Sequence, residues 1–223
     1  MYFQFLTEDK STEVLVEQIM NKLKEAYPQK ELFYDIKSFH GIGHLKKQGN
    51  AQQQKTGMLL NDLFPIMRGI GKALLQVEHA VIIVIMDNDK NDKTAFRNEL
   101  NQMAVSNMVL ADHEFCIAVK EMEAWLLGDV KAIEAAYPNA RKSAWKEYEQ
   151  DGICDTWEVL ANAIYPGGLT ELRKKAAGTY KQIGIVKCEW ARMIGAQMSL
   201  TENASPSYHF FVESLTKRIE TTC

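Results

Sequence analysis

Two aspartates that follow directly after a continuous apolar run have the spacing of a chemical site. The run covers residues 80–86, and Asp87 and Asp89 come immediately after it. It is rich in β-branched residues, lacks alternation and is too short for a membrane span, so it predicts a buried central strand of a parallel sheet. Ligands of open α/β sheets bind outside the carboxyl ends of the strands. Two carboxylates there repel each other, and a hard divalent cation such as Mg²⁺ removes that conflict.

A third carboxylate, Glu8, follows the first strand candidate, residues 1–6. Neighbouring parallel strands lie about 4.8 Å apart, so Glu8, Asp87 and Asp89 would meet at one rim if their strands are neighbours. Three acids at one rim make a metal site, and a metal that bridges phosphate oxygens and activates water suits phosphodiester cleavage. The alternative is that Glu8 is a solvated turn residue, because turns after strands are commonly acidic.

Strand and helix patterns alternate over the first 135 residues. This order predicts an α/β, Rossmann-like, mainly parallel sheet with helices on both faces. Ser11 is the predicted N-cap of the first helix, and Pro65 should kink or break the second. The predicted strands are 1–6, 31–39, 80–86 and a segment within 108–119, and the predicted helices are 11–26, 51–75, 94–105 and one that starts near 121.

Residues 136–223 show short helical patterns and no strand pattern, which predicts an α-helical appendage packed on an α/β domain of residues 1–135. Asp155 is a predicted helix N-cap. Basic residues interleaved with Trp145, Tyr148 and Tyr180 indicate a nucleic-acid or partner face, or simply solvated helices with an aromatic core. The basic residues are Arg141, Lys142, Lys146, Arg173, Lys174, Lys175, Lys181 and Lys187.

The bulk composition is that of a globular protein and excludes disordered and fibrous classes. The 223 residues are 46% hydrophobic and 25% charged, with a formal net charge of -3. This charge gives no global attraction to nucleic acid, so such binding needs a local basic face or a partner. Four scattered cysteines, an apolar start interrupted by residues 8–10 and the lack of a membrane-length segment predict a cytoplasmic protein with no membrane association. There is no P-loop motif, so any ATP dependence would come from a partner.

Further side chains near the predicted rim could contact substrate. Lys10 and Lys90 flank the acidic loops and could bind a scissile phosphate, or they are solvated counter-charges. A tight loop with His40 at its start has glycines that could let backbone amides approach phosphate. Glu121 and Glu123, two apart on a predicted helix, point about 200° apart, so one of them can face the rim.

A strand followed by Glu8 and a helix, and later a strand ending in Asp-x-Asp, resembles the Toprim domain shared by topoisomerases, primases and the overcoming-lysogenization-defect nucleases. The acids that bind Mg²⁺ in that family fall on Glu8, Asp87 and Asp89. Segment 117–129 is similar to the Glu-Ala-Trp-Leu-Leu segment of an uncharacterised Toprim-like family. The tail resembles that family in Trp190-Ala191, Ile194-Gly195, Ser205-Pro206-Ser207-Tyr208 and Phe211. The residue after the first Glu is often Gly in Toprim proteins but is Asp9 here, which could alter the approach of phosphate.

The resemblance implies a function and a partner. Members of the uncharacterised family are typically encoded beside an ABC- or SMC-like ATPase in bacterial defence loci. We therefore expect a nuclease or other phosphodiesterase that uses Mg²⁺ (or Mn²⁺), acts with such an ATPase and takes part in defence against foreign DNA. Glu123, which adjoins the Ala-Trp-Leu segment as in the related family, is expected to complete the site formed by Glu8, Asp87 and Asp89.

Two other functions remain open. Haloacid-dehalogenase-type phosphatases also place Asp-x-Asp after a strand and use the first Asp as a nucleophile, which would be Asp87. Their motif usually follows the first strand and continues to a Thr or Val where this chain has Asn91. The second alternative is a non-catalytic module that binds the ATPase through its helical tail and keeps the acids for structural Mg²⁺.

Overall fold

A single all-parallel sheet forms the centre of the computed structural model, which describes residues 1–45, 57–88 and 92–222. Its spatial strand order is β2-β1-β3-β4. Chain order therefore reverses between β1 and β3, and this reversal point is where open α/β sheets bind ligands. The strands are β1 (Tyr2–Thr7), β2 (Phe33–Ser38), β3 (Ala80–Asp87) and β4 (His113–Ala118).

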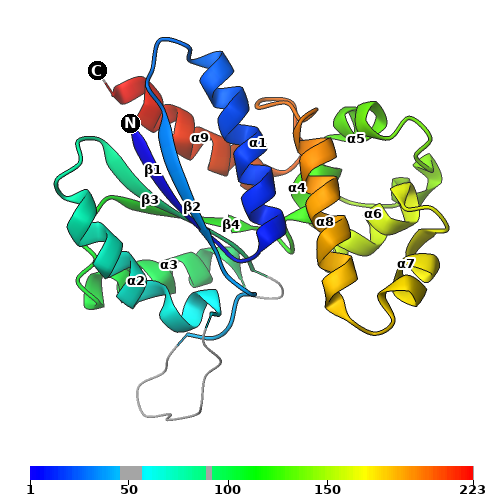
Figure 1. Cartoon of the computed structure of the whole chain (residues 1–223), viewed down its shortest axis with the longest axis horizontal. Coiled ribbons are helices and arrows are strands. Elements are labelled where there is room, and N and C mark those ends of the chain that lie inside the picture. The colour runs from blue at the N-terminus through cyan, green and yellow to red at the C-terminus, as the bar shows by residue number, and fades with distance from the viewer. Residues whose placement is uncertain (46–56, 89–91, 223) are drawn as a thin grey trace.

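Helices cover both faces of the sheet, as the alternating pattern predicts. Phe3, Phe5 and Ile83 belong to the cluster that includes α1 (Lys10–Ala26) and α9 (Pro206–Thr221). On the other face Ile82 and Val84 pack with α2 (Leu59–Leu74) and α3 (Lys93–Ser106). Figure 1 shows these two pairs of helices on opposite sides of the strands. The α/β, Rossmann-like class predicted for the chain is thus confirmed.

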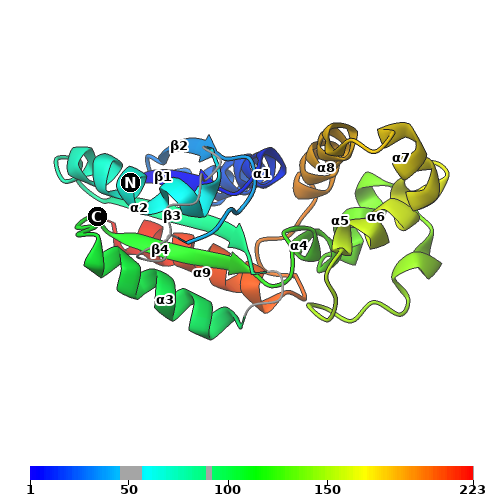
Figure 2. The same ribbon diagram turned by 90° about the horizontal axis from the view of Figure 1, so that it is seen from below.

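The helical part lies beyond the carboxyl ends of the strands, where the arrowheads in Figure 2 point toward α4 and α8. Its elements are α4 (Glu123–Leu127), α5 (Val130–Ala136), the 3₁₀ turn η1 (Lys142–Trp145), α6 (Thr156–Ile164), α7 (Gly168–Ala176) and α8 (Tyr180–Gly195). The last helix, α9, returns to the sheet and packs against β4 (Figure 1). In the described residues from 136 to 222 the structure contains helices and turns but no strand.

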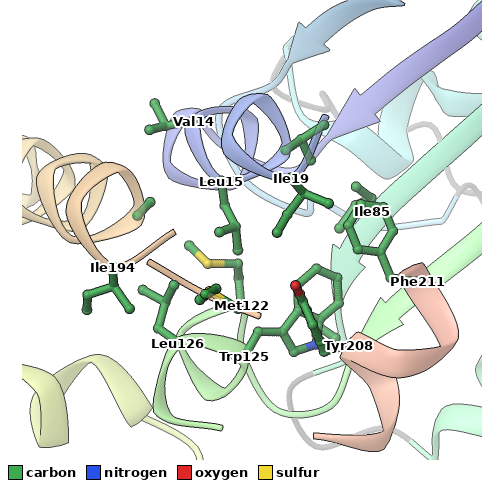
Figure 3. Close-up of a cluster of buried hydrophobic side chains, with 14 of the residues drawn as sticks. Val14, Leu15, Ile19, Ile85, Met122, Trp125, Leu126, Ile194, Tyr208 and Phe211 are labelled. Atoms are coloured by element: carbon green, nitrogen blue, oxygen red, sulfur yellow. The ribbon is translucent and has the colours of Figure 1, made fainter. Parts of the chain in front are cut away.

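A continuous apolar cluster joins the helical part to the sheet. Trp125 of α4 stacks on Phe211 of α9 with ring centroids 5.2 Å apart, and its indole Nε1 donates a 2.8 Å hydrogen bond to Ser207 Oγ. Leu15 of α1 and Ile194 of α8 belong to the same cluster (Figure 3). This cluster contains residues from both sides of the predicted boundary at residue 135, so the two parts pack directly against each other. The division into two domains stays a prediction.

Two local predictions are wrong. The N-cap of α1 is Asp9 and not Ser11: the Asp9 carboxylate accepts a 2.8 Å hydrogen bond from Thr12 N, and Ser11 lies inside the first turn. Pro65 neither breaks α2 nor ends it, since the helix runs continuously from Leu59 to Leu74. Proline removes one backbone donor, and the apolar face that α2 packs on the sheet keeps the helix together. The part of the predicted helix at residues 51–56 lies outside the described residues.

No helix in the described parts of the chain is both long enough and apolar enough to cross a membrane.

Candidate functional site

Glu8 and Asp87 meet at the carboxyl edge of the sheet because β1 and β3 are neighbours in parallel register. Glu8 N donates to Ile85 O at 3.1 Å, which continues the ladder one residue past β1. The Glu8 carboxylate turns toward β3, and its Oε2 accepts a 3.1 Å hydrogen bond from Asp87 N. The two acids lie at the strand-order reversal and line the same cleft. The structure therefore brings together two of the three predicted metal ligands.

Asn88 ties the end of β3 to the loop after β4. Its side chain is 4% exposed, its Oδ1 accepts a 2.6 Å hydrogen bond from Lys120 N, and its own N donates to Ala118 O. Lys120 has a positive φ of 70°, which turns the chain sharply toward Glu121. Asn88 thus positions the loop after β4 against the end of β3. The spacing of the acidic residues did not predict this role. The other two predicted residues of this loop, Asp89 and Lys90, lie outside the described residues.

A buried ion pair lies behind the rim. Glu123, at the start of α4, is fully buried, and Lys187 Nζ on α8 lies 2.9 Å from its Oε1. Apart from this ion-pair contact, neither carboxylate oxygen of Glu123 has a hydrogen-bond partner within the described part of the chain. Lys187 is 20% exposed and lines the cleft with Glu8 and Asp87. The carboxylates that attract its ammonium are Glu123, Asp9 and Asp87.

The sequence predicted Glu121 and Glu123 on one helix with Glu123 facing the rim, and the structure differs on both points. α4 begins at Glu123, so Glu121 belongs to the preceding turn. Glu121 lines the cleft and accepts a 2.8 Å hydrogen bond from Thr156 Oγ1, whereas Glu123 points into the protein. Glu121 is therefore the carboxylate open to a ligand, and Glu123 acts on the cleft through Lys187.

The proton affinities of this group follow from burial and crowding. Removal from bulk water raises the pKa of Asp87 well above its ordinary value, and the Glu8 and Glu123 carboxylates raise it further. Burial likewise raises the pKa of Glu123, and the Lys187 charge opposes that change. For Lys187, burial acts to lower the pKa, but the attraction of Glu123, Asp9 and Asp87 outweighs it, so its pKa is raised and it stays charged.

The cleft itself has a volume of about 870 Å³ and lies between the sheet edge and α6, α7 and α8. Its acidic side chains outnumber its basic ones. The acidic lining residues are Glu8, Asp9, Asp87, Glu121, Asp155 and Glu158, and the basic ones are Arg173 and Lys187. Part of this charge is already matched, because Arg173 pairs with Glu158 and Asp9 caps α1. Glu8 and Asp87 place two carboxylates at the β1–β3 edge, and this local negative charge favours a bound cation there.

The remaining candidates are divided between the cleft and the surface. Lys10 is exposed, pairs with Glu13 on the same helix and does not line the cleft. His40 does line it. Asp155 begins α6 as predicted, but its side chain makes no capping hydrogen bond and instead borders the cleft. The predicted basic and aromatic face is split: Trp145 and Tyr148 pack against the apolar cluster, while Arg173, Tyr180 and Lys187 border the cleft.

Lys187 is the functional candidate whose place the sequence did not predict. One signal was present: Ile183, Val186 and Trp190 form an apolar stripe on α8, and Lys187 lies beside that stripe rather than opposite it. A lysine at such a position must either extend its ammonium to water or find a carboxylate. The choice of Glu123 as partner depends on how α8 packs over α4, which no local pattern encodes.

The donor set agrees in chemistry with a hard divalent cation but is incomplete in number. Glu8 and Asp87 offer oxygen ligands of the kind that Mg²⁺ and Mn²⁺ prefer. Within residues 1–45, 57–88 and 92–222 no group of three His, Cys, Asp or Glu side chains has the arrangement of a metal site. Asp89, the third predicted ligand, lies outside the described residues.

Comparison of the chain with known proteins gave no match to any family model, curated protein or solved structure.

Proposed function

We propose that the protein is a Mg²⁺- or Mn²⁺-dependent phosphodiesterase of the nuclease type. The observation that supports this most directly is the Glu8–Asp87 pair at the strand-order reversal, facing a cleft that also contains the Lys187 ammonium. Carboxylates for a cation and a fixed ammonium for a phosphate are the parts that phosphodiester hydrolysis needs.

Each residue has a distinct role in this proposal. A divalent cation held by Glu8, Asp87 and Asp89 would polarise the phosphate and lower the pKa of a bound water. Lys187 has three N–H donors and lines the cleft as well as pairing with Glu123, so its ammonium can bind a phosphate oxygen. Glu123 positions Lys187. Glu121, which is open to the cleft, can accept a proton from the attacking water.

The partner proposed from the Toprim resemblance is an ABC- or SMC-like ATPase, in a system that defends against foreign DNA. A formal net charge of -3 and the acidic cleft are consistent with a protein that needs cations, and a second protein, to approach nucleic acid. In this arrangement ATP is used by the partner and phosphodiester chemistry belongs to this chain.

The test is cleavage of single-stranded DNA, duplex DNA and RNA in Mg²⁺, in Mn²⁺ and in chelator, with and without the neighbouring ATPase. We expect metal-dependent cleavage by the wild type and none by Asp87→Asn or Glu8→Gln. Asp112→Asn is the matched control, because Asp112 lies before β4 at the opposite edge of the sheet. Cleavage that persists in chelator or in Asp87→Asn would overturn the assignment.

A non-catalytic, partner-binding module is the second candidate. It is favoured by the Lys187–Glu123 pair, which already neutralises part of the acidic cluster, and by the lack of a three-residue metal group in the described residues. Wild-type protein that binds the ATPase but cleaves no substrate under any of these conditions would support it. A phosphate trapped covalently on Asp87 would instead favour the haloacid-dehalogenase-type phosphatase.

A further inference from the structure

One face of α8 places an aromatic ring, a bare backbone and an ammonium in a row along the cleft. Tyr180, Gly184 and Lys187 are four and three residues apart, so they lie on the same side of the helix, and all three line the cleft. From Tyr180 to Lys187 the helix rises by about 10 Å. That length is comparable to the distance from a nucleobase to a phosphate of its own or the adjacent nucleotide.

Tyr180 presents its ring to solvent at the mouth of the cleft. Its side chain is 84% exposed at the start of α8. The indole of Trp157, from α6, is partly buried and lines the same cleft. Two aromatic side chains in the lining of one cleft offer flat faces on which an unpaired base can stack, and every base has such a face.

Gly184 destabilises α8, and the described packing of the helix gives no reason for a glycine at this position. Glycine inside a helix is destabilising by about 1 kcal/mol relative to alanine. A Cβ at Gly184 would meet no atom within 4 Å, so no packing contact within the described residues excludes a side chain there. The absence of a side chain between Tyr180 and Lys187 leaves room for a ligand to lie against the backbone of α8.

We propose that Tyr180, Gly184 and Lys187, with Trp157, form a subsite for one unpaired nucleotide, so that the substrate of the cleft is single-stranded nucleic acid. The base stacks on Tyr180, the sugar passes over Gly184, and the phosphate lies between Lys187 and the Glu8–Asp87 edge. This inference rests on the proposed phosphodiesterase function for its phosphate end. A paired base has its faces covered by its neighbours in the duplex, so a duplex cannot occupy the aromatic end.

Binding is measured by fluorescence anisotropy of a short, labelled DNA strand in Ca²⁺, which shields the acidic cleft and does not require turnover. The same strand is tested annealed to its complement and as a deoxyribose-phosphate strand without bases. We expect the single strand to bind at least about fivefold more tightly than either, because one base stack changes affinity by about 5- to 100-fold. Equal affinity for the three strands, or no binding of any of them, would overturn the proposal.

Variants of Tyr180 separate stacking from hydrogen bonding. Tyr180→Ala should weaken binding of the single strand by about 5- to 100-fold, whereas Tyr180→Phe, which keeps the ring, should change it by about twofold at most. The strand without bases should not distinguish the two variants from the wild type. Loss of affinity in Tyr180→Phe equal to that in Tyr180→Ala would contradict the stacking role.

Gly184→Leu tests the open backbone, with Gly69→Leu in α2 as its matched control. Gly69 is also helical and exposed, and a Cβ there also meets nothing within 4 Å. Both substitutions should raise the thermal unfolding midpoint, because leucine favours a helix. Only Gly184→Leu should weaken single-strand binding, by about tenfold. Unchanged binding in a folded Gly184→Leu protein would refute the subsite.

The two proposals can fail separately. If the binding pattern is as expected but no strand is cleaved in Mg²⁺ or Mn²⁺, the subsite stands and the phosphodiesterase function is wrong. If Asp87-dependent cleavage occurs equally on duplex and single strands, and Tyr180→Ala leaves it unchanged, the function stands and the subsite is wrong.

Discussion

The amino and carboxyl ends of the strands, which form the amino edge and the carboxyl edge of the sheet, both carry acidic and basic side chains but differ in how exposed these are. At the amino edge Arg218 lies 3.0 Å from Asp112 and 3.7 Å from Glu114, and the Asp112 side chain is 56% exposed. At the carboxyl edge Lys187 pairs with Glu123, which is buried, while Glu8 and Asp87 lie nearby. Water screens the first cluster, whereas in the second cluster Glu123 is fully buried and Glu8 and Asp87 are half-buried at the cleft. This difference supports the proposal that the carboxyl edge binds a ligand, whereas the amino edge carries a structural ion pair.

The largest difference between the two edges should be in the free energy of unfolding when the basic side chain of each edge is removed. Lys187→Met leaves Glu123 as an unpaired buried charge, and we expect a loss of about 3–5 kcal/mol in the free energy of unfolding. Arg218→Met should cost about 1 kcal/mol or less, because its partners remain hydrated. Urea unfolding monitored by tryptophan fluorescence measures both. Adding Glu123→Gln to Lys187→Met should restore most of the loss, and equal losses at the two edges would contradict the comparison.

The next effect concerns one acid at each edge. Asp87→Asn removes repulsion from Glu8 and Glu123, so it should raise the free energy of unfolding of the metal-free protein by roughly 1 kcal/mol while lowering metal-dependent activity by about 100-fold or more. Asp112→Asn removes a favourable partner of Arg218, so it should lower stability slightly and leave activity unchanged. Denaturant unfolding measures the stability of the two variants, and calorimetric titration with Mn²⁺ measures their metal binding. A destabilised Asp87→Asn protein would refute the repulsion argument.

The pH dependence of stability gives a smaller effect with a defined sign. The pKa of Asp87 is raised in the folded state, so its contribution to stability is fully present below the ordinary carboxyl pKa and is lost as pH rises through the raised value. We therefore expect the metal-free wild type to gain stability relative to Asp87→Asn as pH falls from about 8 to about 5. Added Mg²⁺ should reduce that gain by favouring the ionised carboxylate. Parallel pH profiles for the two proteins would show that Asp87 is not perturbed.

The smallest effect on stability and activity is predicted for Lys10, an exposed lysine close in sequence to Glu8 but outside the cleft. Lys10→Ala removes its pair with Glu13, which should change the free energy of unfolding by about 0.5 kcal/mol at most. Strand binding and cleavage should stay at the wild-type level, in contrast to Lys187→Met. A substantial loss of cleavage in Lys10→Ala would show that the phosphate approaches from the α1 side.

Much of the fold could be predicted from local patterns. The apolar run before Asp87 indicated a buried strand, and β3 is an interior strand of the sheet. The Ser11 prediction failed by two residues because Ser and Asp are both good N-caps, and the choice depends on where the chain leaves β1. Pro65 was expected to kink or break its helix, and the helix is unbroken because its apolar face packs on the sheet; the kink stays a prediction.

The candidate site was predictable in part. Glu8 and Asp87 each end a strand, and parallel strands bring their carboxyl ends to one edge, so their meeting followed once β1 and β3 were neighbours. The choice of Glu123 over Glu121 for the rim was wrong, because α4 begins only at Glu123 and the preceding turn directs Glu121 to the cleft. Lys187 was grouped with surface bases because its partner lies on another helix, far away in the chain.

The sequence by itself determined the alternation of strands and helices, the buried central strand and the placement of acids at strand ends. These depend on hydrophobic periodicity and chain direction, which act over a few residues. Only the tertiary structure decided that α8 lies over the carboxyl edge, that Lys187 meets Glu123 and that Tyr180 faces the same cleft. The physical reason is that a buried charge is stable only beside a particular partner, and which partner it meets is set by the packing of distant segments.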